Sequence, residues 1–257
     1  MIEAFTHRMK SRSAALLLAL DNRLDRILQC WLLFAGLIAA ARIVLSQPSA
    51  PVAGFSTFAS YMLLVVAPFA STLLALHWFR EGHLQPQPRT RLAVFGRWNK
   101  LTPAEAERHH LYGSNGLMVS LLVGMMLNVP VRAAEYLAAM PPVGVAAPDW
   151  LQALHFAMTF DVVLFGSLYM IAFVAALRRV PLFPRLLVAI WVGDIAMQLF
   201  TANLVARSGD LPAEVANALH SLLEGNVKKV LISAALWLPY LLLSTRVNVT
   251  FRHRLPA

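Results

Sequence analysis

Six long apolar stretches, separated by shorter polar segments, dominate the pattern of this sequence. A bilayer core of about 30 Å is crossed by about 20 helical residues, each rising 1.5 Å. The runs are too long, and too uniformly apolar, for alternating strands. The pattern therefore predicts an all-α polytopic membrane protein with a single membrane domain over residues 1–257. Its bundle of six transmembrane helices is expected at residues 27–46, 58–79, 114–131, 151–177, 186–206 and 230–244. The third and last of these are short, which leaves open an interfacial extension of the third over 131–140 and an earlier start of the last.

Helical spacing also recurs in polar segments beside the spans. In residues 1–26 leucines recur every three or four positions and arginines flank them, which predicts an amphipathic helix in the headgroup layer rather than a cleaved signal peptide. Residues 211–225 predict a second surface helix before the last span. In the basic loop 80–113, Thr102 and Glu105 have the spacing of a capping box, which predicts the start of a short helix.

Composition and charge add an orientation to this picture. The chain is 58% hydrophobic and 14% charged, with a net charge of +9. Of its 22 lysines and arginines, 17 fall on one side of the predicted spans and 5 on the other. This asymmetry predicts that both termini are cytoplasmic and that the basic segments contact the anionic cytoplasmic leaflet of the lipid bilayer. The charge lies in short clusters between apolar runs, so nucleic acid is not expected as a partner.

Small residues recur at every fourth position of the third span. These are Gly116, Ser120, Gly124 and Asn128, and such a row lets a neighbouring helix backbone approach closely. We expect it to be a packing face. The sequence has no P-loop, no nucleophile elbow and no paired cysteines. We therefore expect no catalytic residue, no cofactor and no metal ligand.

A polar stripe crosses the fifth span. Asp194, Gln198 and Thr201 lie on one face of an otherwise apolar helix, and Asp194 is about 14 Å into the membrane at 1.5 Å per residue. Charges inside a span are costly and face the bundle or a cavity. One interpretation is a proton or cation site, and the other is a structural carboxyl bonded to a neighbouring helix. The sequence leaves both open.

Two further charges are predicted to share a depth. Arg42 on the first span and Asp161 on the fourth each lie about 24–25 Å from the cytoplasmic boundary at the helical rise. We expect these two helices to be neighbours and the two side chains to form an intramembrane ion pair, because an isolated charge there would be disfavoured. The alternative is that Arg42 extends outward alone while Asp161 bonds a helix backbone or Asn203.

The last hundred residues resemble a family of bacterial multi-pass membrane proteins known only as domain of unknown function 2569. A Trp-x-Pro-Tyr helix end leads into Ser-x-Arg-Val and Thr-Phe in that family. The corresponding residues here are Trp237, Pro239, Tyr240, Ser244, Arg246, Val247, Thr250 and Phe251. Within 151–254, Asp161 also precedes basic residues and the pair Phe183 and Pro184, and the first helix near Trp31 is similar more weakly.

This chain differs from the family pattern in two ways. Residues 57–150 have no counterpart, and Asp161 stands where a glutamate is expected. The resemblance implies a location in the bacterial inner (cytoplasmic) membrane and brings no catalytic residue with it. The leading functional prediction is a non-catalytic subunit that binds, stabilises or assembles a membrane-protein partner or forms a homo-oligomer. The alternatives are a small proton- or cation-linked transporter using Asp194, Gln198 and Thr201, and a membrane-embedded enzyme.

Overall fold

Six long helices form the protein in the computed structural model, which describes residues 2–45, 55–89, 92, 96–143, 147–207 and 211–257. Residues 2–12 and 55–57 are described by their backbone alone. Each of the six is long and apolar enough to cross a membrane, so the chain is an all-α multi-pass membrane protein. They are α1 (Ile2–Leu45), α2 (Phe55–Trp78), α4 (Leu117–Ala139), α5 (Asp149–Leu177), α6 (Phe183–Arg207) and α7 (Ala213–Leu243).

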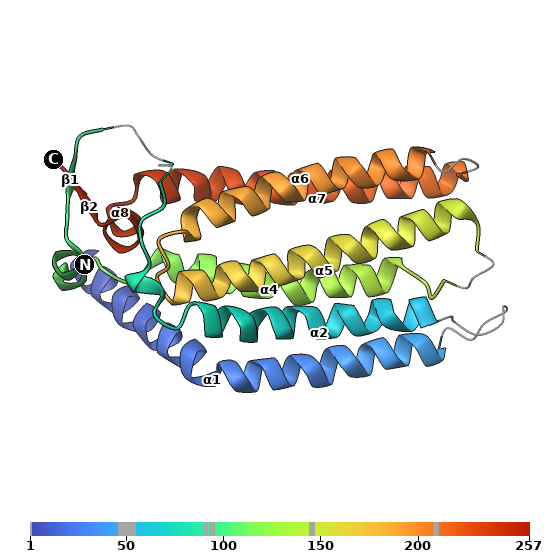
Figure 1. The fold of residues 1–257 in the computed structure, drawn as a ribbon, viewed down its shortest axis with the longest axis horizontal. Helices are drawn as coiled ribbons and strands as arrows, with labels where there is room; N and C mark the ends of the chain where they lie inside the picture. Colours follow the sequence, from blue (N-terminus) through green and yellow to red (C-terminus); the bar gives the residue numbers. More distant parts are fainter. Residues whose placement is uncertain (1, 46–54, 90–91, 93–95, 144–146, 208–210) are drawn as a thin grey trace.

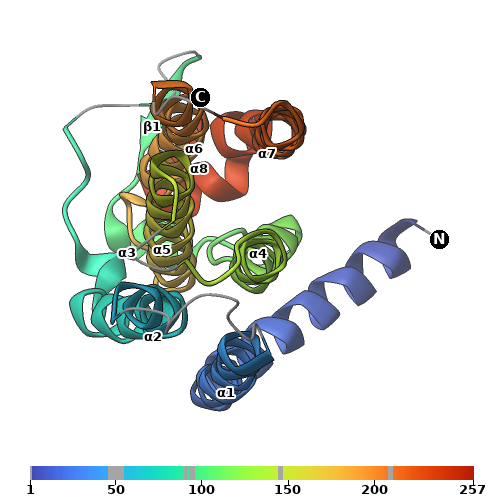
Figure 2. The same cartoon turned by 90° about the vertical axis from the view of Figure 1, so that its right-hand side faces the viewer.

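The helices run side by side in one elongated bundle, and both chain termini lie at the same end (Figure 1). We call this the terminal end and the other the far end. Helix α5 is central and packs against α2, α4 and α6, whereas α1 packs against α2 and α4. Helix α7 packs against α6 on the other side of the bundle (Figure 2). The N-terminal part of α1 diverges from the bundle axis (Figure 2).

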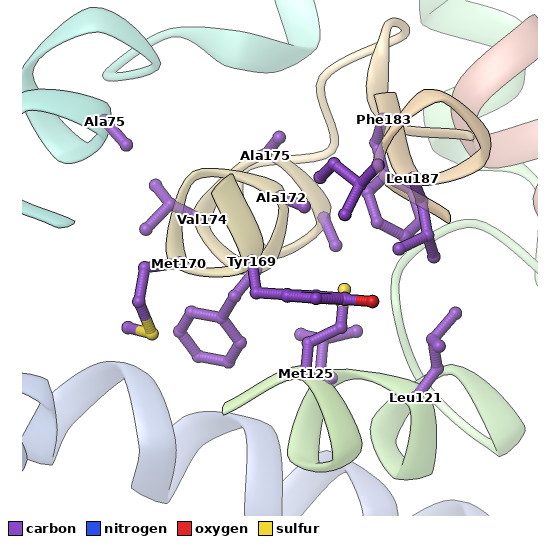
Figure 3. Close-up of a cluster of buried hydrophobic side chains, with 14 of the residues drawn as sticks. Ala75, Leu121, Met125, Tyr169, Met170, Ala172, Val174, Ala175, Phe183 and Leu187 are labelled. Carbon is purple, nitrogen blue, oxygen red and sulfur yellow. The ribbon is translucent and has the colours of Figure 1, made fainter. Parts of the chain in front are cut away.

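The apolar core is centred on α5 near the terminal end (Figure 3). The buried alanines of α5 give it a slim surface at 172, 175 and 176, onto which Phe183 and Leu187 of α6 and Met125 of α4 pack. Side chains from α4 and α6 therefore interdigitate on the surface of α5, and such contacts fix the bundle's lateral order.

The small-residue row of the third span does not form the predicted packing face. Gly116 lies just before α4 as its N-cap with φ 71°, a conformation that favours glycine. Ser120 and Gly124 are exposed, and a Cβ placed on Gly124 would meet nothing within 4 Å. The close approach occurs at Gly166 of α5 instead, where an added Cβ would lie 3.4 Å from the ring of Pro68 in α2.

Three helices are longer than predicted. The amphipathic N-terminus and the first span form the single helix α1, and the surface helix 211–225 and the last span form the single helix α7. Helix α4 continues through Pro130 to Ala139, so Arg132 lies inside a membrane-length helix and not beyond the end of the span. Helical hydrogen bonds satisfy the backbone within the bilayer, which favours continuation through such weakly polar junctions.

Short elements close the terminal end. Strands β1 (Trp98–Lys100) and β2 (Arg254–Pro256) pair antiparallel, and α8 (Thr245–Arg252) precedes β2. The guanidinium of Arg254 lies 4.2 Å from the centre of the Trp98 ring, and Arg246 donates to the carbonyls of Leu111 and Gly113. The basic tail is therefore docked onto the preceding loop.

That loop also contains the 3-10 turn η1 (Gly82–Leu84) and the short helix α3 (Pro103–Arg108). The predicted capping box is confirmed, since Thr102 and Glu105 exchange hydrogen bonds at the start of α3.

Candidate functional site: an intramembrane charged network

Arg132 of α4 lies at the centre of a buried charged network. Its Nη1 donates to Asp161 of α5 at 2.9 Å, its Nη2 donates to Asp194 of α6, and its Nε donates to Asn128 at 3.0 Å. The side chain of Arg132 is only 12% exposed, and that of Asp194 is completely buried. One guanidinium thus joins three helices through charge-assisted hydrogen bonds, which are stronger than neutral ones.

An amide side chain bridges the two carboxylates. Gln198 of α6 donates through Nε2 to Asp161 at 3.1 Å and to Asp194 at 3.3 Å. Its carbonyl oxygen accepts from Asn226 of α7 at 3.3 Å. The amide therefore extends the network to a fourth helix and orients both acids toward Arg132.

Aromatic side chains cover the guanidinium. The rings of Phe165 and Tyr169 in α5 have their centres 5.3 and 5.8 Å from the Cζ of Arg132. The hydroxyl of Tyr169 also donates to Asp194 at 3.3 Å. The rings exclude water from one side of the cation and attract it through their negative faces.

A cavity of about 650 Å³ opens beside this network. Arg132 and Asp161 form part of its wall together with Tyr169, and Asn226 lines it from α7. Further lining residues are Asn128, Glu135, Tyr136, Ser221, Lys229 and Ser233. The volume lies within the range of small-molecule binding sites, and the lining combines apolar walls with a few convergent polar groups.

A second ion pair lies at the rim of the cavity. Lys229 of α7 bonds Glu135 of α4, and both side chains are about half exposed. This pair spans the two helices between which the cavity lies. Lys229 lies mid-helix and contacts a neighbouring helix.

The network lies well inside the membrane-length part of the bundle. Asp194 is 11 residues from Phe183 and Asp161 is 16 residues from Leu177, which places them about 16 and 24 Å from the terminal end at 1.5 Å per residue. At such depths an ionised group without compensation is strongly disfavoured.

Formal charges in and beside the cavity do not cancel. Arg132 and Lys229 supply two positive charges, whereas Asp161, Asp194 and Glu135 supply three negative ones. One acid is therefore in excess. A proton or a bound cation on one of the two aspartates would restore neutrality.

The structure brings together two of the three residues of the predicted polar stripe. Asp194 and Gln198 are in the network, and Asp194 contacts α4 and α5 through Arg132 and Tyr169. Thr201 is buried on the same face of α6, but among the described residues it takes no part in the hydrogen bonds that join Arg132 to the aspartates and amides. Asn128, predicted as a packing residue, is a ligand of Arg132 instead.

The predicted pair of Arg42 and Asp161 is corrected to Arg132 and Asp161. Asp161 bonds Arg132 at 2.9 Å, and α1 packs against α2 and α4 rather than forming the expected interface with α5. Arg42 interacts with Tyr61 of α2. Its depth was similar to that of Asp161, but its helix lies at the periphery of the bundle (Figure 2).

Sequence analysis missed Arg132, Tyr169 and Asn226 as members of the site. Arg132 follows Asn128 by four residues, so a polar stripe along α4 could have signalled it had the helix not been ended at residue 131. Asn226 and Lys229 likewise share a face of α7 once that helix is continuous. Arg132 and Asn226 were missed because the predicted helices ended too early.

Comparison with known proteins adds no assignment. No protein-family model matches the chain, no curated protein matches it, and no solved structure matches its fold.

Proposed function

We propose that the protein is a small proton- or cation-linked membrane transporter whose coupling site is the pair Asp161 and Asp194. The observation that carries the proposal is the excess acid: two buried carboxylates share one guanidinium beside a 650 Å³ cavity. A site that must gain a positive charge to become neutral is suited to binding a coupling ion.

The geometry suggests separate roles for the two aspartates. Asp161 lines the cavity, so it can exchange a proton or cation with a solute there. Asp194 has no exposed side-chain surface and is held by Arg132, Gln198 and Tyr169. Binding at Asp161 weakens its ion pair with Arg132 and leaves Asp194 as the remaining charged partner. The cavity's amides and hydroxyls fit a small polar solute.

The location that we propose is the bacterial inner membrane with the terminal end facing the cytoplasm. The basic asymmetry supports it, since the outer side keeps few cationic loop residues once Arg132, Lys228 and Lys229 are placed in helices. The resemblance of residues 151–254 to domain of unknown function 2569 is part of the same proposal. Reporter fusions after residues 100 and 257 should read cytoplasmic, and an external signal at either site would contradict this orientation.

Infrared difference spectroscopy on protein in nanodiscs tests the excess charge. At neutral pH we expect the band of one protonated intramembrane carboxyl, which Asp161→Asn and Asp194→Asn each remove because the remaining aspartate is neutralised by Arg132. Asp149 is exposed and lies on α5, the helix that also contains Asp161, so Asp149→Asn is the matched control and should leave the band unchanged. If the coupling ion is sodium, we expect no such band. Sodium should then raise the unfolding temperature of the wild type, and the same two variants should abolish this effect.

Transport itself is tested on solid-supported membranes with proteoliposomes. Amino acids, sugars and small organic cations are applied in turn, and a current that Asp161→Asn abolishes and Asp149→Asn retains supports the proposal. A wild-type protein with no protonated carboxyl, no sodium dependence and no current with any of these solutes would make the network purely structural.

The accessory role expected from the sequence remains the second candidate. In the most apolar stretch of α7 only 11% of the residues are buried, compared with 61% in that of α5. Helix α7 therefore offers a broad surface to lipid or to another helix. Purification in mild detergent tests this role: a stoichiometric membrane partner lost on substitution of exposed α7 residues supports it, and a protein isolated alone argues against it.

A further inference from the structure

Three arginines from separate segments gather at the terminal end of the bundle. Arg185 lies in the first turn of α6, Arg252 ends α8, and Arg254 begins β2. The two helices meet through the rings of Phe183 and Phe251, whose centres are 5.1 Å apart. Apolar packing thus holds like charges close together.

Arg185 and Arg252 each have a buried N–H group that has no acceptor among the described residues. The Nε of Arg185 is inaccessible to solvent, and no hydrogen bond or ion pair to its side chain is found within the described part of the chain. Arg252 donates through Nη1 to Asn248 at 2.9 Å, but its buried Nη2 has no acceptor among the same residues. Buried polar groups are normally satisfied, so these two arginines lack part of the compensation that buried cations usually have.

The cluster has little internal charge compensation. Asn248, completely buried, accepts from both Arg252 and Arg254, but an amide oxygen carries no net charge. The pKa of Arg252 is lowered to about 10 by burial and by the charges of Arg254 and Arg185. Within residues 96–143, 147–207 and 211–257, no carboxylate is within ion-pair distance of Arg185 or Arg252.

The neighbouring Arg178 shows what a compensated arginine looks like here. It too has a buried Nε, but its Nη2 lies 3.4 Å from a carboxylate oxygen of Asp21 in α1. The helix dipole adds to the uncompensated positive charge at Arg185, because this residue is two positions from the start of α6, where the helix itself is electropositive.

We propose that Arg185 and Arg252 bind one phosphate group at the terminal end of the bundle. The first turn of α6 marks where a membrane-length helix meets the headgroup layer, so the phosphodiester of an anionic phospholipid is one source and free phosphate is the other. Guanidinium groups donate paired hydrogen bonds to phosphate oxygens through their accessible N–H groups, and the negative charge of the phosphate offsets the repulsion between the arginines. This site is separate from the network around Arg132 and does not depend on the proposed transport.

Native mass spectrometry of protein released from nanodiscs tests the lipid source. With phosphatidylglycerol we expect one lipid retained per chain, and with phosphatidylcholine none. Arg185→Gln and Arg252→Gln should each weaken retention about tenfold, the effect of losing one charge-assisted hydrogen bond. Arg108→Gln removes an exposed charge from α3 at the same end and should leave retention unchanged.

Inorganic phosphate in phosphatidylcholine nanodiscs tests the other source. Thermal stabilisation by phosphate but not by chloride at equal ionic strength, lost in the Arg185→Gln and Arg252→Gln variants, assigns the site to free phosphate. The proposal is overturned if neither probe binds, or if both bind the Gln variants as well as they bind Arg108→Gln.

A stability comparison separates a binding site from a structural role. Without an anion, Arg252→Gln removes a repelled and partly buried charge, so its unfolding temperature in phosphatidylcholine should equal or exceed that of the wild type. In phosphatidylglycerol the wild type should gain stability and the variant should not. A variant that is destabilised equally in both lipids, or that fails to fold in either, shows that Arg252 holds the fold together, and this would also overturn the proposal.

Discussion

Replacement of Arg132 is the most direct test of the charged network. Arg132→Gln removes the cation that bonds Asp161 at 2.9 Å and Asp194 in the interior, while a shorter, neutral polar side chain remains. Removing one partner of a buried pair typically costs about 3–5 kcal/mol, because the other charge is stranded. Two carboxylates are stranded here, but protonation can relieve part of the cost, so we expect a loss within this range.

The loss converts into a measurable shift of unfolding temperature. In a domain of about 150–250 residues, 1 kcal/mol corresponds to about 2–4 °C, so Arg132→Gln should unfold about 6–20 °C below the wild type. The chain's six tryptophans make intrinsic fluorescence a suitable readout in detergent. Arg207→Gln, an exposed arginine at the far end of α6, is the matched control and should shift the temperature by less than about 2 °C.

A second substitution tells whether stranded charge causes the loss. Asp194→Asn in the Arg132→Gln background removes one of the two carboxylates without changing the shape of the side chain. The double variant should recover more than half of the lost stability, because the cost lies mostly in the uncompensated charge. An Arg132→Gln protein as stable as the control, or a double variant less stable than the single one, refutes the reasoning.

Three further predictions follow from the contacts. A double-mutant cycle should show coupling of less than about 0.5 kcal/mol between Arg42 and Asp161, since α1 packs mainly against α2 and α4 and Asp161 bonds Arg132 instead. A larger coupling in thermal unfolding would restore the sequence-based pair. Gly166→Leu should destabilise by about 1–3 kcal/mol because its Cβ would already lie 3.4 Å from a proline ring in α2, whereas Gly124→Leu should be silent in the same assay. Hydrogen bonds from Thr102 lower the pKa of Glu105, so the capping box is intact above the ordinary glutamate pKa and is lost as the pH falls through the lowered pKa. Amide exchange within α3, measured at decreasing pH, should show this loss of protection. Protection of α3 that does not change with pH would contradict it.

Local properties of the sequence were sufficient to predict the number and approximate position of the long helices. Apolar length sets a transmembrane span because backbone groups in lipid must be satisfied within one segment, and the capping box at Thr102 depends on residues three positions apart. The exact ends of the helices were harder to predict. The sequence around Arg132 and Lys229 reads as a boundary because it is charged, but both residues lie inside helices whose charges are compensated by other helices.

The sequence by itself determined that six helices cross the membrane, that Asp161 and Asp194 are buried at depth, and that such charges require partners. Only the tertiary structure decided which partner each acid has. The helical rise fixes the depth of a residue along the bundle axis, and Arg42 and Arg132 both come near the depth of Asp161. Lateral order is set by side-chain packing between segments far apart in the chain, and that packing places α4 beside α5 and leaves α1 at the edge.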